Sequence, residues 1–358
     1  MAKKTKNVSS SSSLSSLPDE IVLDCLVRVP RSDYESVSSV SGRLRSLVRS
    51  PELQRLRSLL HKESVYVCFC EKDNYHDPTP TYLWFTLRQS KTAEYHLVPI
   101  SFPCRKFMFR SSTVAVDSEI YFINEYPKPT ELWILDTRSG KLRQGPIMRE
   151  TPFAERSAVG VVDGKMYVTQ ALQNGSTREE VFDLKSQTWQ VPGIAVPDDK
   201  VDIRLMMASC VTLEGKVYAM NNGSITVYNL REQGRKEKLE MPIDDRVKRI
   251  CLADNLLFAL FTKGGLMWLD TNLNLWRTVK GDVQPLHCML YSGAMAEYYG
   301  KLLLFWTETE THTGDKVWCA LIALARPGQE VCGTVEWSGV VATLPYVCRI
   351  QHCVVASD

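Results

Sequence analysis

Short runs of apolar residues, separated by turn residues, make up most of the chain from residue 64 onward. The clearest stretch is 156–189, RSAVGVVDGKMYVTQALQNGSTREEVFDLKSQTW, in which Asp163-Gly164 is a dipeptide typical of tight hairpin turns. The pattern predicts four strands, at 158–162, 166–168, 181–183 and 188–191. One sheet of four short strands cannot bury both of its faces alone, so a unit of this kind is stable only when copies of it stack.

Copies of this unit recur along the chain. Its turn, followed by apolar and aromatic residues, is found at 117–121, 163–167, 214–218, 254–258 and 299–303. Successive turns are 46, 51, 40 and 45 residues apart. In the second half of the unit an acid is followed six residues later by tryptophan, as in Asp183 to Trp189 and Asp270 to Trp276. A period of about 40–50 residues with four strands per repeat predicts the blades of a β-propeller.

One blade is divided between the two ends of this region. The segments 64–68, 82–87 and 95–100 match the second, third and fourth strands of a blade, but no first strand precedes them. The last residues, 353–358, match a first strand and its turn acid. Pairing of the C-terminal strand with the strand near Val65 closes the ring and removes the two sheet edges that would otherwise be exposed at the ends of this region. We therefore predict six blades.

The first 61 residues follow a different pattern. Residues 1–16 are basic and then serine-rich and predict a disordered tail; a transit peptide is disfavoured because arginine is absent. Leu17-Pro18-Asp19-Glu20 begins a helical pattern that ends at Pro30. Further helices are expected at 32–40, 42–48 and 52–61. We therefore expect a multidomain chain, with a small all-α domain at 17–61 and an all-β propeller at 62–358.

The helical segment, LPDEIVLDCLVRVP followed by VSSVSGRLRSLVRSPEL, resembles an F-box. This resemblance implies docking onto a Skp-type adaptor, and through it onto a cullin–RING ubiquitin ligase. Leu44 departs from the pattern, because many F-boxes carry Trp or Phe there. The alternative is a helical cap that only packs on the propeller. The positions that match the family's contact motif are Leu17, Pro18, Ile21, Leu26, Val29 and Pro30.

The repeats, from about residue 105 to 340, resemble kelch repeats: an apolar strand, D/E-G-K-hydrophobic-Tyr, then hydrophobic-D-x5-W. The usual Gly-Gly pair is replaced, for example by Thr169-Gln170 and Asn124-Glu125. As a whole the chain resembles plant-type F-box/kelch-repeat proteins. This implies a non-catalytic substrate receptor of an SCF-type E3 ubiquitin ligase, which holds its target near the ligase and raises their effective concentration. The alternatives are a kelch scaffold independent of the ligase and a propeller enzyme.

Composition and charge exclude several other classes. The formal net charge is +2, which gives no argument for binding nucleic acid or an acidic membrane surface, and no apolar run is long enough to span a bilayer. The eleven cysteines have no CxxC spacing, and several lie in apolar strands, for example Cys210, Cys251 and Cys319. This use of cysteine is typical of buried thiols in a reducing compartment, so we expect the cytoplasm or nucleus.

Residue patterns for catalysis or metal binding are absent from the sequence. There are six histidines, and no HExxH, GxSxG or glycine-rich phosphate loop occurs. The two His-Cys dipeptides, His287-Cys288 and His352-Cys353, are expected in strands, where adjacent side chains point to opposite faces and cannot readily chelate one ion. We expect no cofactor. Acids at repeat-equivalent positions are interpreted as turn formers, namely Asp136, Asp183 and Asp270.

In several blades an arginine is expected just ahead of the first strand. Equivalent positions of a propeller lie on one face of the ring, so these side chains are expected around the central opening. There they are candidates for binding an acidic or phosphorylated segment of a target protein. The alternative is that each pairs with an acid of a neighbouring blade. The five positions are Arg110, Arg156, Arg204, Arg249 and Arg349. The identity of the target is not encoded in any motif.

Overall fold

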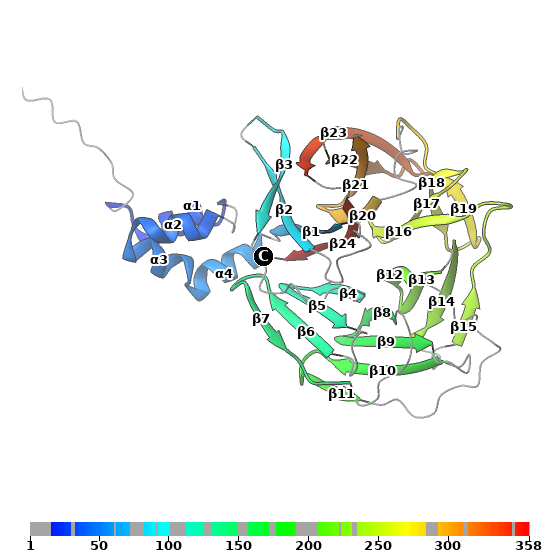
Figure 1. The fold of residues 1–358 in the computed structure, drawn as a ribbon, viewed down its shortest axis with the longest axis horizontal. Coiled ribbons are helices and arrows are strands. Elements are labelled where there is room, and N and C mark those ends of the chain that lie inside the picture. Colours follow the sequence, from blue (N-terminus) through cyan, green and yellow to red (C-terminus); the bar gives the residue numbers. More distant parts are fainter. Residues whose placement is uncertain are drawn as a thin grey trace, which may run out of the picture. The chain divides into compact units, whose positions relative to one another are not determined.

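Helices occupy the start of the chain and strands the rest, in a computed structural model (Figure 1). The chain divides into two compact units, Met1–Lys62 and Glu63–Ser357. The residues that the structure describes are 16–29, 33–60, 62–71, 82–90, 92–100, 112–124, 131–148, 157–171, 177–190, 207–221, 223–230, 235–283, 293–310, 314–345 and 348–357.

The helical unit contains α1 (Asp19–Leu26), α2 (Tyr34–Val40), α3 (Gly42–Val48) and α4 (Pro51–Leu59). Helix α3 begins where the Ser41 side chain accepts a hydrogen bond from the Leu44 amide, and Ser50 does the same for Leu53 at the start of α4. Their apolar faces meet in one small core, whose buried members are Val22, Leu23, Leu26, Val27, Leu47 and Leu53.

The propeller consists of six four-stranded antiparallel sheets. The closing blade contains β24 (Cys348–Ser357), β1 (Glu63–Glu71), β2 (Tyr82–Gln89) and β3 (Tyr95–Ile100). The second contains β4 (Ser112–Val116), β5 (Glu119–Asn124), β6 (Glu131–Asp136) and β7 (Lys141–Gln144). The third contains β8 (Ser157–Val162), β9 (Lys165–Ala171), β10 (Thr177–Asp183) and β11 (Thr188–Gln190).

The remaining three blades follow the same order along the chain. The fourth contains β12 (Met207–Leu213), β13 (Lys216–Asn221), β14 (Ser224–Asn229) and β15 (Arg235–Lys238). The fifth contains β16 (Val247–Ala253), β17 (Leu256–Phe261), β18 (Gly265–Asp270) and β19 (Leu275–Thr278). The sixth contains β20 (Gly293–Tyr298), β21 (Lys301–Glu310), β22 (Gly314–Ala325) and β23 (Cys332–Leu344).

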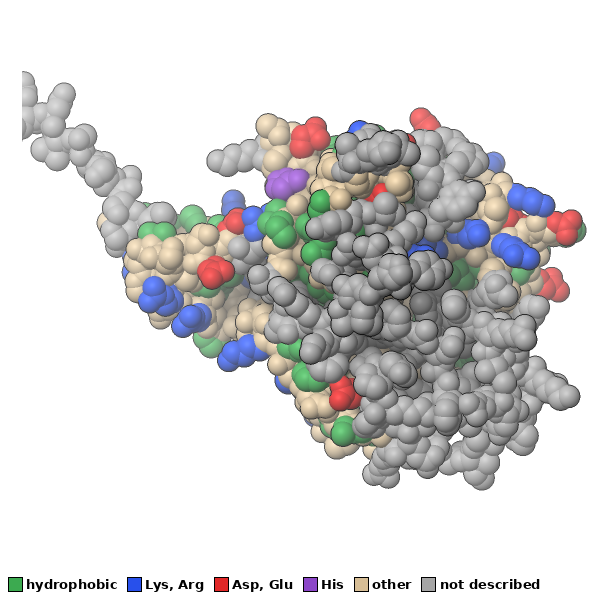
Figure 2. All heavy atoms as spheres, viewed as in Figure 1, with side chains coloured by type: hydrophobic (Ala, Val, Ile, Leu, Met, Phe, Trp, Pro, Cys, Tyr) green, Lys and Arg blue, Asp and Glu red, His purple; other side chains and the backbone are tan. Residues whose placement is uncertain are grey.

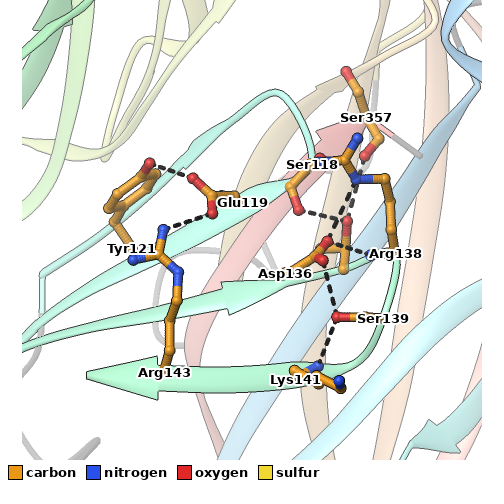
Figure 3. A network of polar contacts seen from close by, with 10 residues as sticks. Ser118, Glu119, Tyr121, Asp136, Arg138, Ser139, Lys141, Arg143 and Ser357 are labelled. Carbon is orange, nitrogen blue, oxygen red and sulfur yellow. Dashed lines mark hydrogen bonds and ion pairs between the residues drawn. The ribbon is translucent and has the colours of Figure 1, made fainter. Parts of the chain in front are cut away.

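The predicted closure of the ring is confirmed. Strand β24 pairs antiparallel with β1, with Val65 opposite Val355 and Glu63 opposite Ser357. The end of β24 is also attached to the second blade (Figure 3), since the Ser357 amide donates to the Asp117 carbonyl at 2.7 Å and the Thr137 hydroxyl lies 3.4 Å from the Ser357 carbonyl. Strand β24 is therefore hydrogen-bonded both to β1 of its own blade and to the second blade.

The hairpin turns between first and second strands explain the recurring acid. In the third blade Asp163 and Gly164 have φ angles of +49° and +72°, the left-handed conformation that a two-residue hairpin turn requires at both positions. The acids Asp117, Glu214 and Asp254 adopt the same conformation at equivalent turns. The left-handed backbone conformation of these turns therefore explains why glycine and acidic residues recur there.

The core lies between neighbouring blades. The face of β1 that carries Val65, Val67 and Phe69, none of them exposed, packs against the sixth blade, where Phe305 and Val317 are equally buried. Similar layers separate the other blades. Polar links lie nearer the surface (Figure 3): the Arg143 guanidinium joins Glu119 of its own blade, at 2.8 Å, to Gln187 of the next, at 3.0 Å.

Candidate functional site

The outer side of α1 presents an apolar stripe, formed by Pro18, Ile21, Cys25 and Val29 and called here the α1 stripe. Pro18 and Cys25 are exposed, Ile21 is 48% exposed and Val29 is half-buried. The spacing of three and four residues places Pro18, Ile21 and Cys25 along one side of α1, and Val29 follows in the turn after the helix ends at Leu26. An apolar stripe of this kind on a small helical unit is suited to docking against another protein.

The structure places the remaining residues of the predicted adaptor contact in different surroundings. Leu17 is half-buried and packs against the core of the helical unit. Leu26 is 4% exposed and lies inside that core, so its side chain is not available to a partner in this conformation. Pro30 lies outside the described residues. Leu44, where the F-box pattern departs from Trp or Phe, packs against the same core.

Arg57 of α4 holds the helical unit together. Its side chain is 3% exposed, and one guanidinium nitrogen donates to the Val29 carbonyl and to the Tyr34 hydroxyl, both at 2.8 Å. The same nitrogen lies 3.3 Å from the Val27 carbonyl. Tyr34 in turn donates to the Leu26 carbonyl at 2.8 Å, and its ring lies 5.4 Å from the guanidinium. One cation thus satisfies carbonyls at the end of α1 and joins α1, α2 and α4.

A second arginine fixes the start of α1. The Arg43 guanidinium donates to the Leu17 carbonyl at 2.6 Å and to the Asp19 carboxylate at 2.5 Å. These contacts join α3 to the first turn of α1, beside the α1 stripe. Blue Lys and Arg side chains lie on the surface of the helical unit in Figure 2. Arg45 of α3, Arg49 at the end of α3 and Arg55 of α4 are exposed.

Two of the five recurring arginines lie in the described part of the propeller. Arg110, Arg156 and Arg204 fall outside the described residues. Arg249 lies within β16 and Arg349 within β24, near the start of each strand and not ahead of it as expected, because pairing with β17 and β1 extends the strands further towards their start. These are the innermost strands of the fifth and closing blades, separated around the ring by β20 (Figure 1). Because inner strands start on the same face of a propeller, both arginines lie on that face, as the repeat predicts.

The Arg249 guanidinium is directed from β16 towards β20. Its Nε donates to the Gly293 carbonyl, the first residue of β20, and one terminal nitrogen donates to the Lys248 carbonyl at 2.5 Å. Burial lowers the pKa of Arg249, and the positive charge of Arg349 lowers it further. Both arginines thus belong to strands that contact β20.

Arg349 differs from Arg249 in exposure. Its side chain is exposed, while the adjacent Cys348 is buried and its amide donates to the buried Asp315 carboxylate at 2.7 Å. Asp315 fixes the backbone at the start of β24 and so sets the position from which Arg349 projects. A single sequence gives no signal for this role, because Asp315 comes from β22 of another blade.

The residues considered for catalysis or metal binding have structural partners. His352 lies 2.7 Å from the Thr113 hydroxyl and stacks on Trp84, whereas Cys353 packs in the core facing the sixth blade, so the two point to opposite faces. His287-Cys288 lies outside the described residues. Burial raises the pKa of Cys353 to about 12, which keeps it a thiol at neutral pH.

The repeat-equivalent acids act in turns. Asp136 accepts from the Arg138 amide at 2.9 Å, and Asp183 accepts from the Ser186 amide at 2.8 Å (Figure 3 shows the first). Asp270 is bonded in the same way to the two amides that follow it by two and three residues. In the described ranges, no group of three or more His, Cys, Asp or Glu side chains is arranged to hold a metal ion. No described helix is long and apolar enough to cross a membrane.

Comparisons with known proteins match both units. The F-box domain family matches residues 14–56, and the FKB95, Kelch-repeats domain family matches residues 84–342. A relative from Arabidopsis thaliana with an F-box/kelch-repeat name is 62% identical over 99% of this chain and 100% of its own length. Two further F-box/kelch-repeat proteins of Arabidopsis thaliana are each 38% identical, covering 98% and 94% of this chain and 96% and 91% of their own lengths.

Proposed function

This chain belongs to the family of F-box/kelch-repeat proteins, and on that premise we propose that it recruits target proteins to an SCF-type E3 ubiquitin ligase for ubiquitination and degradation. The F-box and kelch repeats together indicate an adaptor of the substrate-receptor type. In this role the helical unit binds a Skp-type adaptor and the propeller binds the target. The transfer of ubiquitin then takes place on other subunits, and this chain makes and breaks no covalent bond.

The observation that carries the proposal is the α1 stripe. Ile21, near the centre of the α1 stripe, is 48% exposed. The other large apolar side chains of α1 are buried in the core of the helical unit. Burial of exposed apolar surface against a partner is the main source of binding free energy in such interfaces. The match of residues 14–56 to the F-box family supports assigning that partner as a Skp-type adaptor.

Binding to a recombinant plant Skp-type adaptor, measured by isothermal titration calorimetry, tests the first step. Ile21→Asp places a charge in the centre of the interface and is expected to weaken binding by about tenfold or more, a cost of at least 1.4 kcal/mol. Leu59→Asp is the matched control, because Leu59 is 62% exposed but lies beyond the F-box match. Equal affinity of wild type and Ile21→Asp contradicts the assignment.

The second step is tested in plant cells. Target proteins are expected to accumulate when the proteasome is inhibited and to become less abundant when the wild-type chain is overproduced. Overproduction of Ile21→Asp is expected to leave their abundance unchanged. A kelch scaffold independent of the ligase predicts the same target abundance with both chains.

We propose the cytoplasm or nucleus as the place of action, which a fluorescent fusion of the full chain tests.

A further inference from the structure

Two arginines lie near the same end of the inner strands on either side of β20. Arg249 and Arg349 come from β16 and β24, on either side of β20, and the Arg249 guanidinium reaches the first residue of β20. Strand β20 contacts both β16 and β24, so the two arginines start from strands that flank one neighbour. Burial lowers the pKa of Arg249, and the positive charge of Arg349 lowers it further. Arginine does not lose its proton in proteins, so both groups remain charged.

No carboxylate offsets this pair within the described part of the chain. The recorded acceptors of Arg249 are two neutral backbone carbonyls, and none of the ion pairs formed among the described residues includes Arg249 or Arg349. Asp245, four residues before Arg249 in the sequence, is engaged elsewhere, since its carboxylate accepts from the Lys263 and Gly264 amides at 2.9 and 2.7 Å. The alternative that these arginines pair with acids of neighbouring blades therefore has no support at these two positions.

An uncompensated pair of this kind is costly for the folded protein. Partial burial removes hydration from the Arg249 guanidinium, and a like charge nearby adds repulsion. An oxyanion bound from outside offsets both costs, because the planar guanidinium donates to carboxylate or phosphate through paired N–H groups. Arg249 retains a terminal nitrogen with no recorded acceptor, and Arg349 is exposed to solvent.

We propose that Arg249 and Arg349 form an oxyanion site on this face of the propeller, which binds carboxylate or phosphate groups carried by the recruited protein. This inference rests on the proposed function, and it specifies the class of target as a protein with an acidic or phosphorylated segment. Asp315 assists by holding the Cys348 amide at 2.7 Å, which orders the strand that carries Arg349.

Fluorescence anisotropy with the full-length chain and labelled hexapeptides tests the proposal. The probes are hexaglutamate, hexaglutamine, a Gly-Ser peptide with two phosphoserines and its unphosphorylated form. At least one anionic peptide is expected to bind more tightly than its neutral counterpart, and the tighter of the two anionic peptides identifies the carboxylate or the phosphate as the preferred group. Binding of both anionic peptides no tighter than the neutral ones overturns the proposal.

Matched variants separate a specific site from general charge attraction. Arg349→Gln is expected to weaken binding of the anionic peptide about tenfold, and Arg349→Lys less. Arg277→Gln removes the same charge from the fifth blade, where Arg277 lies 3.1 Å from Asp270, and is expected to leave binding within about twofold. Equal loss in the Gln variants at 349 and 277 means that net charge alone attracts the peptide and overturns the proposal.

Two further measurements keep the result interpretable. Arg349 is exposed, so Arg349→Gln is expected to fold, and thermal unfolding of the variant checks this directly. Arg349→Gln is also expected to bind the Skp-type adaptor with wild-type affinity. Loss of peptide binding with adaptor binding retained supports the oxyanion site. If Arg349→Gln retains both peptide binding and adaptor binding, the proposal of an oxyanion site is overturned and the proposed adaptor function stands.

Discussion

At the scale of single residues, Arg57 joins three helices of the helical unit through one side chain. The carbonyl groups at the end of a helix lack partners within the helix, and Arg57 donates to two of them, of Val27 and Val29. It also donates to Tyr34, whose hydroxyl is bonded to Leu26. Removal of the guanidinium leaves several buried acceptors unsatisfied at once.

Arg57→Ala is therefore expected to destabilise the helical unit by about 2–4 kcal/mol, because it removes a buried, hydrogen-bonded cation and the packing of its stem. The helical signal in far-UV circular dichroism reports on this unit, since no described residue of the propeller is in an α-helix. That signal is expected to fall, together with adaptor binding. Arg55→Ala is the control, because Arg55 is exposed on the same helix. Equal helical signals in both variants contradict this role of Arg57.

The same scale shows what the sequence alone can and cannot predict. The motif identified Ile21 and Leu26 together as contact residues, but only the packing of the helices decides that Ile21 is exposed and Leu26 buried. Arg57 gives no sequence signal, since an arginine in a short polar helix is ordinarily exposed. The repeat predicted a shared face for Arg249 and Arg349, but only coordinates show that no ion pair among the described residues includes either of them.

At the scale of elements, β24 decides whether the blades form a closed ring. It pairs with β1 along its length, and its last residue is bonded to the second blade through Asp117. Without β24, the buried strand β1 has an unpaired edge carrying Val65, Val67 and Phe69, none of which is exposed in the closed ring. An exposed apolar edge strand is a site of aggregation.

A chain that ends at residue 347 is therefore expected to aggregate or to melt at a much lower temperature than wild type. The loss includes the β1–β24 hydrogen bonds and the apolar contacts of Ile350 and Ala356, both buried. A chain that lacks only Asp358 is the control and is expected to behave as wild type. Size-exclusion chromatography and thermal unfolding measure both variants. A monomeric, fully stable chain ending at 347 shows that ring closure does not depend on β24.

The order of the elements was predictable, whereas their lengths were not. Turn dipeptides and period-2 patterns located the strands, and the missing first strand of one blade predicted the pairing of β24 with β1. The third strand of the third blade was predicted at 181–183, but β10 begins at Thr177 because its polar residues pair with β9 as far as Ala171. Similarly, β21 and β23 both pair with β22 along its length, so the length of each of these strands depends on its neighbours in the sheet.

At the scale of the whole molecule, two units of very different size share one chain. The helical unit has a small core of six buried apolar residues, whereas the propeller packs several large clusters between its blades. Stability rises with the amount of apolar surface buried, so the helical unit is expected to be the weaker of the two. Binding of an adaptor to this unit then adds stability where it is most needed.

Differential scanning calorimetry of the full chain is therefore expected to show two transitions, the lower one from the helical unit. A ligand that binds only a folded unit stabilises it by RT ln(1 + [L]/Kd), about 2.7 kcal/mol when the ligand is at a hundredfold excess over Kd. Saturation with the Skp-type adaptor is expected to raise the lower transition, leaving the propeller transition in place. In Ile21→Asp the adaptor is expected to move neither. A single transition that rises on addition of the adaptor shows instead that the two units unfold as one cooperative unit.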